Sequence, residues 1–129
     1  MTKTQLQNYA RNEAMIHHYQ ERITELMQKA GIQALPPPTS IQQMRKNGSP
    51  QEKYILQAVE LSMRMCALRI KNQAVEAWIY AIDEPAVLDI FRMRYMEERE
   101  WIEIARKLHY SERHCFKIHS DYCRERGIV

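Results

Sequence analysis

Three residues of types that bind metal ions are spaced four apart near the end of the chain: Cys115, His119 and Cys123. On a helix this spacing places them on one face, and cysteine and histidine are ligands that zinc prefers. However, Cys115 and Cys123 would lie about 12 Å apart along the helix axis, whereas Zn–S bonds are about 2.3 Å long. We therefore expect no metal site, with Cys115 in the core and the other two residues partly buried.

No other group of residues suggests catalysis. The sequence contains no Ser/His/Asp arrangement, no glycine-rich phosphate loop and no isolated pair of carboxylates. The adjacent His17 and His18 are most simply an exposed pair on a helix, and the glutamates between positions 97 and 103 are most simply a solvated acidic face. We expect neither an enzymatic activity nor a cofactor.

The stretch from Trp101 to Arg126 has the pattern of two helices joined by a tight turn. Ala105 provides a small residue in the middle of the first helix, and Ser111 stands where it can cap the second. The second helix then places one apolar set on a single face: Cys115, Ile118 and Tyr122. Two short helices with a polar outer face on the second are typical of a helix-turn-helix, whose second helix enters the DNA major groove.

This stretch also resembles a known family. The residues that carry the resemblance are Arg94-Tyr95, Trp101, Glu103-Ile104-Ala105, Leu108, Tyr110-Ser111 and Ile118. Over residues 87–122 they resemble region 4 of bacterial sigma factors, and the whole layout resembles small phage regulators of the ArpU and RinA type, which control late genes. The resemblance implies that the acidic face could meet RNA polymerase. One departure is His109-Tyr110, where the family usually has a glycine before the serine.

The candidate DNA-binding residues surround the turn. We expect base contacts from the exposed start of the second helix, with Arg113, His114 and Lys117 as donors and Glu112 as an acceptor from cytosine N4. Residues better placed for phosphate are Arg106, Lys107, Ser111 and Ser120. From position 84 onward nine cations balance nine anions, although the whole chain carries +3. One copy should therefore bind DNA weakly, and a dimer or a tether to polymerase would add affinity.

The elements that position these residues are expected to be helices throughout. Glycine is scarce and β-branched residues form no alternating runs. A first helix is expected over residues 4–30, with a seven-residue repeat at Tyr9, Ile16, Ile23 and Ala30. A second runs from Ser49 to about Ile82, with two parallel series at Tyr54, Leu61, Leu68, Val75 and Ile82 and at Ala58, Met65, Asn72 and Ile79. We expect Ile55, Val59, Cys66 and Ile70 to widen this stripe.

These helices lead us to expect an all-α fold, with a long N-terminal helical hairpin over residues 1–82 and a helix-turn-helix domain over residues 83–129. Gly31 should end the first helix, and Ser49 and Glu52 should form a capping box. Asp83 is expected to cap a third helix that runs to about Met96 and supplies Leu88, Phe91 and Tyr95 as packing partners for Trp101 and Ile104. The Pro-rich linker, residues 33–49, is either a plain connector or a basic strap that touches phosphate through Arg45 and Lys46.

Three cysteines without a C-x-x-C pair favour free thiols in a reducing compartment, and no segment is a secretory signal or a membrane span. We expect a cytoplasmic, sequence-specific regulator that binds double-stranded DNA as a homodimer and controls phage or prophage late genes. One alternative is a small terminase subunit, although its DNA-binding motif usually comes first in the chain. Another is an adaptor that docks on RNA polymerase without reading bases.

Overall fold

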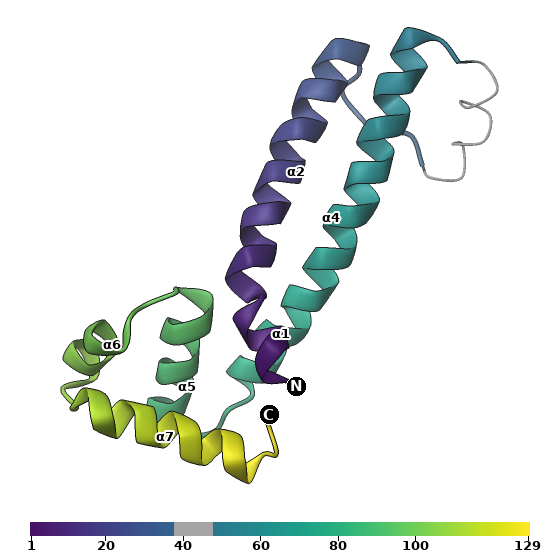
Figure 1. Cartoon of the computed structure of the whole chain (residues 1–129). Helices are drawn as coiled ribbons and strands as arrows, with labels where there is room; N and C mark the ends of the chain where they lie inside the picture. Colours follow the sequence, from purple (N-terminus) through teal and green to yellow (C-terminus); the bar gives the residue numbers. More distant parts are fainter. Residues whose placement is uncertain (38–47) are drawn as a thin grey trace. The chain divides into compact units, whose positions relative to one another are not determined.

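The structure, a computed structural model, describes residues 1–37 and 48–129 (Figure 1). These residues form helices and connecting turns without a strand, which confirms the all-α class. The elements in order are α1 (Lys3–Gln7), α2 (Tyr9–Ala30), α4 (Pro50–Tyr80), α5 (Pro85–Phe91), the π-helix η2 (Arg92–Met96), α6 (Trp101–Leu108) and α7 (Glu112–Glu125). The chain divides into two compact units, one of residues 13–70 and one of residues 1–12 and 71–129. None of the described helices is long and apolar enough to cross a membrane.

The unit of residues 13–70 is built by α2 and α4, which pack side by side (Figure 1). Its buried cluster joins Ile16, Ile23 and Leu26 of α2 to Ala58 and Met65 of α4, which confirms the expected apolar series on both helices. The prediction that further residues widen the apolar stripe of α4 is only partly confirmed. Val59 is buried, but Cys66 and Ile70 are exposed, since they lie on a side of α4 that α2 does not cover.

The ends of these two helices follow local sequence chemistry. Gly31 takes a left-handed φ of 69°, which glycine tolerates at a helix C-terminus. Ser49 Oγ accepts from the Glu52 amide at 3.2 Å, and Glu52 Oε2 accepts from the Ser49 amide at 3.5 Å. Both expected caps are therefore confirmed. The expected strap residues Arg45 and Lys46 lie outside the described residues.

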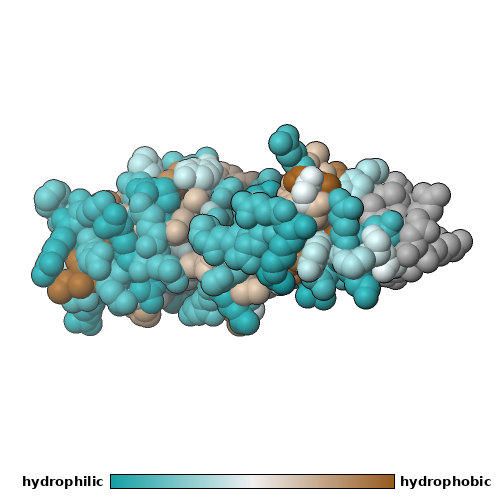
Figure 2. Space-filling model, turned by 90° about the horizontal axis from the view of Figure 1, so that it is seen from above, coloured by the Kyte–Doolittle hydropathy of each residue, from teal (hydrophilic) through white to brown (hydrophobic). Residues whose placement is uncertain are grey.

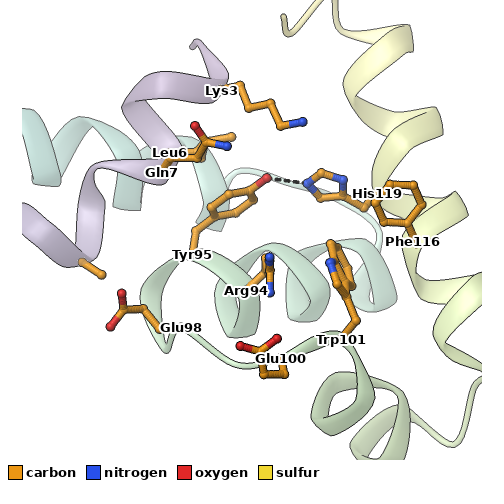
Figure 3. A pocket seen from close by; sticks show the side chains of 11 residues that line it. Lys3, Leu6, Gln7, Arg94, Tyr95, Glu98, Glu100, Trp101, Phe116 and His119 are labelled. Carbon is orange, nitrogen blue, oxygen red and sulfur yellow. Dashed lines mark hydrogen bonds between the residues drawn. The ribbon is translucent and has the colours of Figure 1, made fainter.

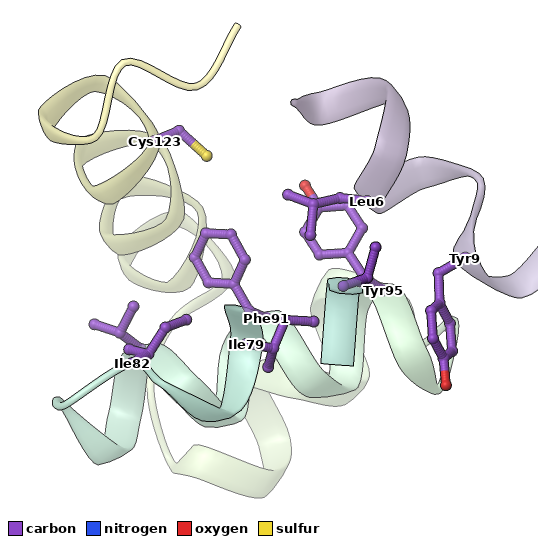
Figure 4. Packing of buried hydrophobic residues seen from close by; sticks show 9 residues of the cluster. Leu6, Tyr9, Ile79, Ile82, Phe91, Tyr95 and Cys123 are labelled. Carbon is purple, nitrogen blue, oxygen red and sulfur yellow. The ribbon is translucent and has the colours of Figure 1, made fainter. Parts of the chain in front are cut away.

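The other unit has a core that draws on both ends of the chain. Leu6 and Tyr9 pack with Ile79 from the end of α4 and with Phe91 and Tyr95 from the α5–η2 segment (Figure 4). Cys123 of α7 belongs to the same cluster. The backbone amide of Lys3 also donates to the carbonyl of Val129, at 3.3 Å. The first residues of the chain therefore form part of the unit that contains α6 and α7.

Two expected helix boundaries in this unit were wrong. The first helix is interrupted at Asn8, which caps α1 with φ −82° and ψ −7° and is a weaker helix former than its neighbours. Glu84, not Asp83, is the N-cap of α5, and it makes no side-chain capping bond. Pro85 explains this second difference, because a residue that precedes proline is forced into the extended conformation that an N-cap adopts.

The expected third helix does run to Met96, but its last turn is a π-helix. Its wider turn is visible in the bond from the Glu97 amide to the Arg92 carbonyl, five residues back, at 3.2 Å. Glu98 then adopts a left-handed φ of 53°, and the Arg99 amide donates to the Met93 carbonyl at 2.9 Å. This reversal directs the chain into α6.

Candidate nucleic-acid interface

The segment from α6 to α7 forms two helices separated by His109, Tyr110 and Ser111. His109 has φ 58°, so it adopts the left-handed conformation that glycine favours, and the Tyr110 amide donates to the Ala105 carbonyl at 3.0 Å. Ser111 Oγ accepts from the His114 amide at 3.1 Å, which confirms the expected N-cap of α7. The turn is therefore built without glycine, and α7 begins where the sequence predicted.

The inner faces of α6 and α7 meet in a small core. Ile104, Ala105 and Cys115 are buried there with Ile90 and Met93. The expected burial of Ile104 is confirmed, but its expected partners Leu88, Phe91 and Tyr95 were wrong. Ile90 and Met93, three residues apart, face α6, whereas Phe91 and Tyr95 lie in the cluster that contains Leu6 and Ile79.

Trp101 is half-buried and sits among charged and aromatic side chains. The guanidinium carbon of Arg94 lies 4.8 Å from the centre of its ring, a cation–π contact. The rings of Phe116 and His119, both on α7, lie 5.5 Å and 5.2 Å from it, edge to face. Trp101 therefore ties the start of α6 to the middle of α7, as expected for a structural residue.

The residues proposed to contact DNA lie on the surface around the turn. All are exposed except Ser120, which is half-buried: Arg106, Lys107, Ser111, Glu112, Arg113, His114, Lys117 and Ser120. On α7 the side chains of Arg113 and Lys117 are one turn apart and opposite the buried Cys115. Figure 2 shows one face of the molecule, which is mostly hydrophilic with small separate hydrophobic patches.

Ion pairs divide the charges of this region into two groups. Arg92 lies 3.1 Å from Glu97 and 3.6 Å from Asp89, while Arg99 lies 3.3 Å from Glu97 and 3.7 Å from Glu103. On α7 the guanidinium of Arg124 lies 2.7 Å from Asp121. Much of the acidic face before the turn is therefore engaged by arginines of its own unit.

The cations around the turn belong to the second group. Among the described residues, Arg106, Lys107, Arg113 and Lys117 form no ion pair. Although nine cations balance nine anions in the sequence from position 84 onward, the ion-paired and the unpaired cations lie in different places. The neutralised arginines lie before the turn and late in α7, whereas four exposed cations without an acidic partner lie at the turn and the start of α7.

His119 is almost completely buried, at 4 % exposure, so the expectation of partial burial was wrong for this residue and for Cys123. The Tyr95 hydroxyl lies 2.5 Å from His119 Nε2, and Cys123 Sγ lies 3.9 Å from the same nitrogen. With the hydroxyl as donor, the ring proton sits on Nδ1, which has no hydrogen-bond partner among the described residues. Burial, with help from Lys3 and Arg94, lowers the pKa of His119 to about 4, so the ring is neutral near pH 7.

The same burial suppresses ionisation of the neighbouring groups. Burial raises the pKa of Tyr95 to about 12, and it raises the pKa of the Cys115 and Cys123 thiols. Protonated thiols are poor nucleophiles and poor metal ligands. The described residues contain no group of three or more side chains able to hold a metal ion, and all three cysteines are free.

A cavity of about 370 Å³ lies beside the Tyr95–His119 pair (Figure 3). Its lining carries two cations, Lys3 and Arg94, and two acids, Glu98 and Glu100. The charges balance, and Arg94 is already held by Trp101 and by the Arg99 carbonyl at 3.1 Å. The wall therefore gives no strong preference for an ion of either sign.

Sequence reasoning missed one residue of the exposed face. Phe116 is 54 % exposed although it is large and apolar, and it lies on α7 three residues after Arg113, on the next turn of the same helix. Its position could have been found from the helical spacing alone, since the apolar set Cys115, Ile118 and Tyr122 faces away from it.

The chain belongs to the family of proteins of unknown function DUF722, whose family model matches residues 3–124. The match spans both units, from α1 to the last turn of α7. No curated protein and no solved structure gives a significant match to the chain.

Proposed function

We propose that this protein is a sequence-specific DNA-binding transcriptional regulator, with α6, the turn and α7 acting as a helix-turn-helix. The observation that carries the proposal is the set of four exposed cations without acidic partners around the turn: Arg106, Lys107, Arg113 and Lys117. Phosphate contacts by such cations provide most of the nonspecific affinity for DNA. The genes that it controls would be phage or prophage late genes, because the layout of the sequence resembles small phage regulators of the ArpU and RinA type.

The roles of the side chains follow from their positions. Arg113 is in the first turn of α7, where recognition helices commonly meet base edges, and its planar fork suits guanine O6 and N7. Lys117 follows one turn later. Arg106 and Lys107 end α6, and with Ser111 they are placed to contact the DNA backbone and fix the docking of α7.

Self-association is the second part of the proposal, because a single copy carries few free cations. The exposed side of α4 bears apolar residues at alternating spacings of four and three: Met63, Ala67, Ile70, Ala74 and Ala77. This is the spacing of a coiled-coil seam, and Met63 and Ile70 are 51 % and 64 % exposed. A second copy that covers this seam would double the DNA-binding surface.

The salt dependence of DNA binding tests the proposal. Affinity for a duplex is measured across a range of salt concentrations for the wild type, for Lys107→Ala and for Lys71→Ala, an exposed lysine of α4. Loss of one phosphate contact should reduce the slope of log affinity against log salt by about 0.9 for Lys107→Ala and leave it unchanged for Lys71→Ala. Absence of any salt-sensitive duplex binding would contradict the proposal and favour an adaptor that contacts only protein.

A further inference from the structure

Phe116 presents a large apolar surface on a face of α7 that is otherwise polar. It follows Arg113 by three residues, so these two side chains are neighbours on the surface of α7, and the exposed Lys117 lies one turn after Arg113. Leaving half of a phenyl ring in water forfeits the free energy that its burial would give. The ring would gain this free energy from an apolar group at the surface that Arg113 and Lys117 also contact.

Contacts with its own chain hold the ring in place. It packs edge to face on Trp101 at 5.5 Å, with an angle of 79° between the two planes, and it stacks beside His119 at 6.4 Å and 30°. Trp101 is in turn held by Arg94, and His119 by Tyr95. Because one edge of Phe116 is fixed against this support, binding through the other edge loses little side-chain entropy.

The major groove of DNA offers one apolar group, the C5-methyl of thymine, among its donors and acceptors. We propose that Phe116 contacts the C5-methyl group of a thymine when α7 lies in the major groove, an inference that rests on the proposed function. Phe116 then determines specificity alongside Arg113. Arg113 recognises hydrogen-bond acceptors, and Phe116 recognises a methyl group.

The spacing of the two side chains limits where this thymine lies. Arg113 and Phe116 are separated by about 4.5 Å along the axis of α7, at about 1.5 Å per residue. Successive base pairs are about 3.4 Å apart. The thymine therefore lies within one or two base-pair steps of the base that Arg113 contacts.

An apolar protein surface fits this face less well. Phe116 also borders a hollow of about 520 Å³ that includes Cys123 and Ile128, which could suggest a protein ligand. However, Arg113 and Lys117 are exposed and without ion-pair partners among the described residues, and an apolar partner would strip water from their charges. DNA satisfies the cations and the ring together.

The test removes single methyl groups from DNA. Fragments bound by the wild type are selected first, and each thymine of the bound site is then replaced in turn by deoxyuridine, which differs by the C5-methyl alone. At one position the wild-type affinity should fall about fourfold, the value for one buried methyl-sized group. Phe116→Ala should bind the thymine and deoxyuridine duplexes equally, whereas Phe116→Leu should keep part of the difference.

The matched control is Ile102→Ala, which shortens another exposed apolar side chain, on α6, and should keep the full thymine preference. Unchanged melting temperatures show that each variant is folded. If no deoxyuridine substitution weakens wild-type binding, or if Phe116→Ala keeps the full discrimination, the role of Phe116 is refuted while DNA binding stands. If the wild type selects no duplex at all, the proposed function itself fails.

Discussion

The Tyr95 hydroxyl and Nε2 of His119 lie 2.5 Å apart in the interior, and this contact joins the π-helix η2 to α7. The two residues lie in different helices and are both buried, at 7 % and 4 % exposure. Phe91 stacks on the same imidazole, with ring centres 4.9 Å apart. Because His119 lies one turn after Cys115 on α7, this contact helps to set the rotation of α7 and hence the direction of its outer face.

The buried imidazole should make stability depend on pH. His119 has a pKa of about 4 in the folded protein and about 6.5 when unfolded, so the unfolded chain binds more protons between these values. The neutral imidazole therefore contributes fully to the free energy of unfolding above pH 6.5. This contribution is lost as the pH falls toward 4, by up to about 3 kcal/mol for a shift of this size. Urea unfolding at pH 7 and at pH 4.5 measures the effect.

His119→Gln removes the titrating group but keeps an acceptor for the Tyr95 hydroxyl. This variant should lose less stability than the wild type between pH 7 and pH 4.5. His18→Gln, which alters an exposed histidine of α2, should behave like the wild type. An equal loss in all three proteins would show that His119 is not protonated on unfolding in the way its burial requires.

Two isoleucines of α6, two residues apart in the sequence, differ in burial. Ile104 is fully buried and Ile102 is 44 % exposed. Ile104→Ala should destabilise the protein by about 2–5 kcal/mol, because it leaves a cavity in the core shared with α7. Ile102→Ala should cost less than about 1 kcal/mol. Thermal or urea unfolding compares them, and similar losses of stability in the two variants would contradict the assignment of Ile104 to the core.

Self-association should depend on the exposed side of α4. Ile70→Glu places a charge in the proposed seam without entering the core, since Ile70 is exposed. It should convert a dimer to a monomer at tens of micromolar while its helix content stays the same. Leu68→Glu is less informative, because Leu68 packs on the core between α2 and α4. Analytical ultracentrifugation of the wild type, Ile70→Glu and the control Ile102→Glu gives the result, and a monomeric wild type would exclude the dimer.

The sequence was most informative where structure is local. Ser49 and Ser111 were recognisable as caps because a serine oxygen satisfies the free amides of the next turn whatever surrounds it. The seven-residue series also identified the inner sides of α2 and α4, since spacing fixes the face of a helix. The helical class and most helix limits could be predicted for the same reason.

Long-range features could not be read in this way. The Tyr95–His119 contact spans twenty-four positions, and the choice between Ile90 and Phe91 as the residue that faces α6 depends on how α5 packs between two clusters. Neither has a local sequence signal, so the partners of Ile104 and the burial of His119 were predicted wrongly. The exposure of Arg113 and Lys117 followed from helical spacing, whereas the separation of paired from unpaired cations required the three-dimensional arrangement of the acids.

The central claim is that the outer face of α7 reads DNA, and Arg113→Ala tests it most directly. Its matched control is Arg124→Ala, which removes an arginine of the same helix that pairs with Asp121. Affinities for the selected site and for an unrelated duplex are measured at one salt concentration, with melting temperatures in parallel. Arg113→Ala should weaken binding to the selected site by about 1–3 kcal/mol and change nonspecific binding and melting little, while Arg124→Ala leaves the preference for the site intact. An unchanged affinity of Arg113→Ala for the selected site would contradict the account.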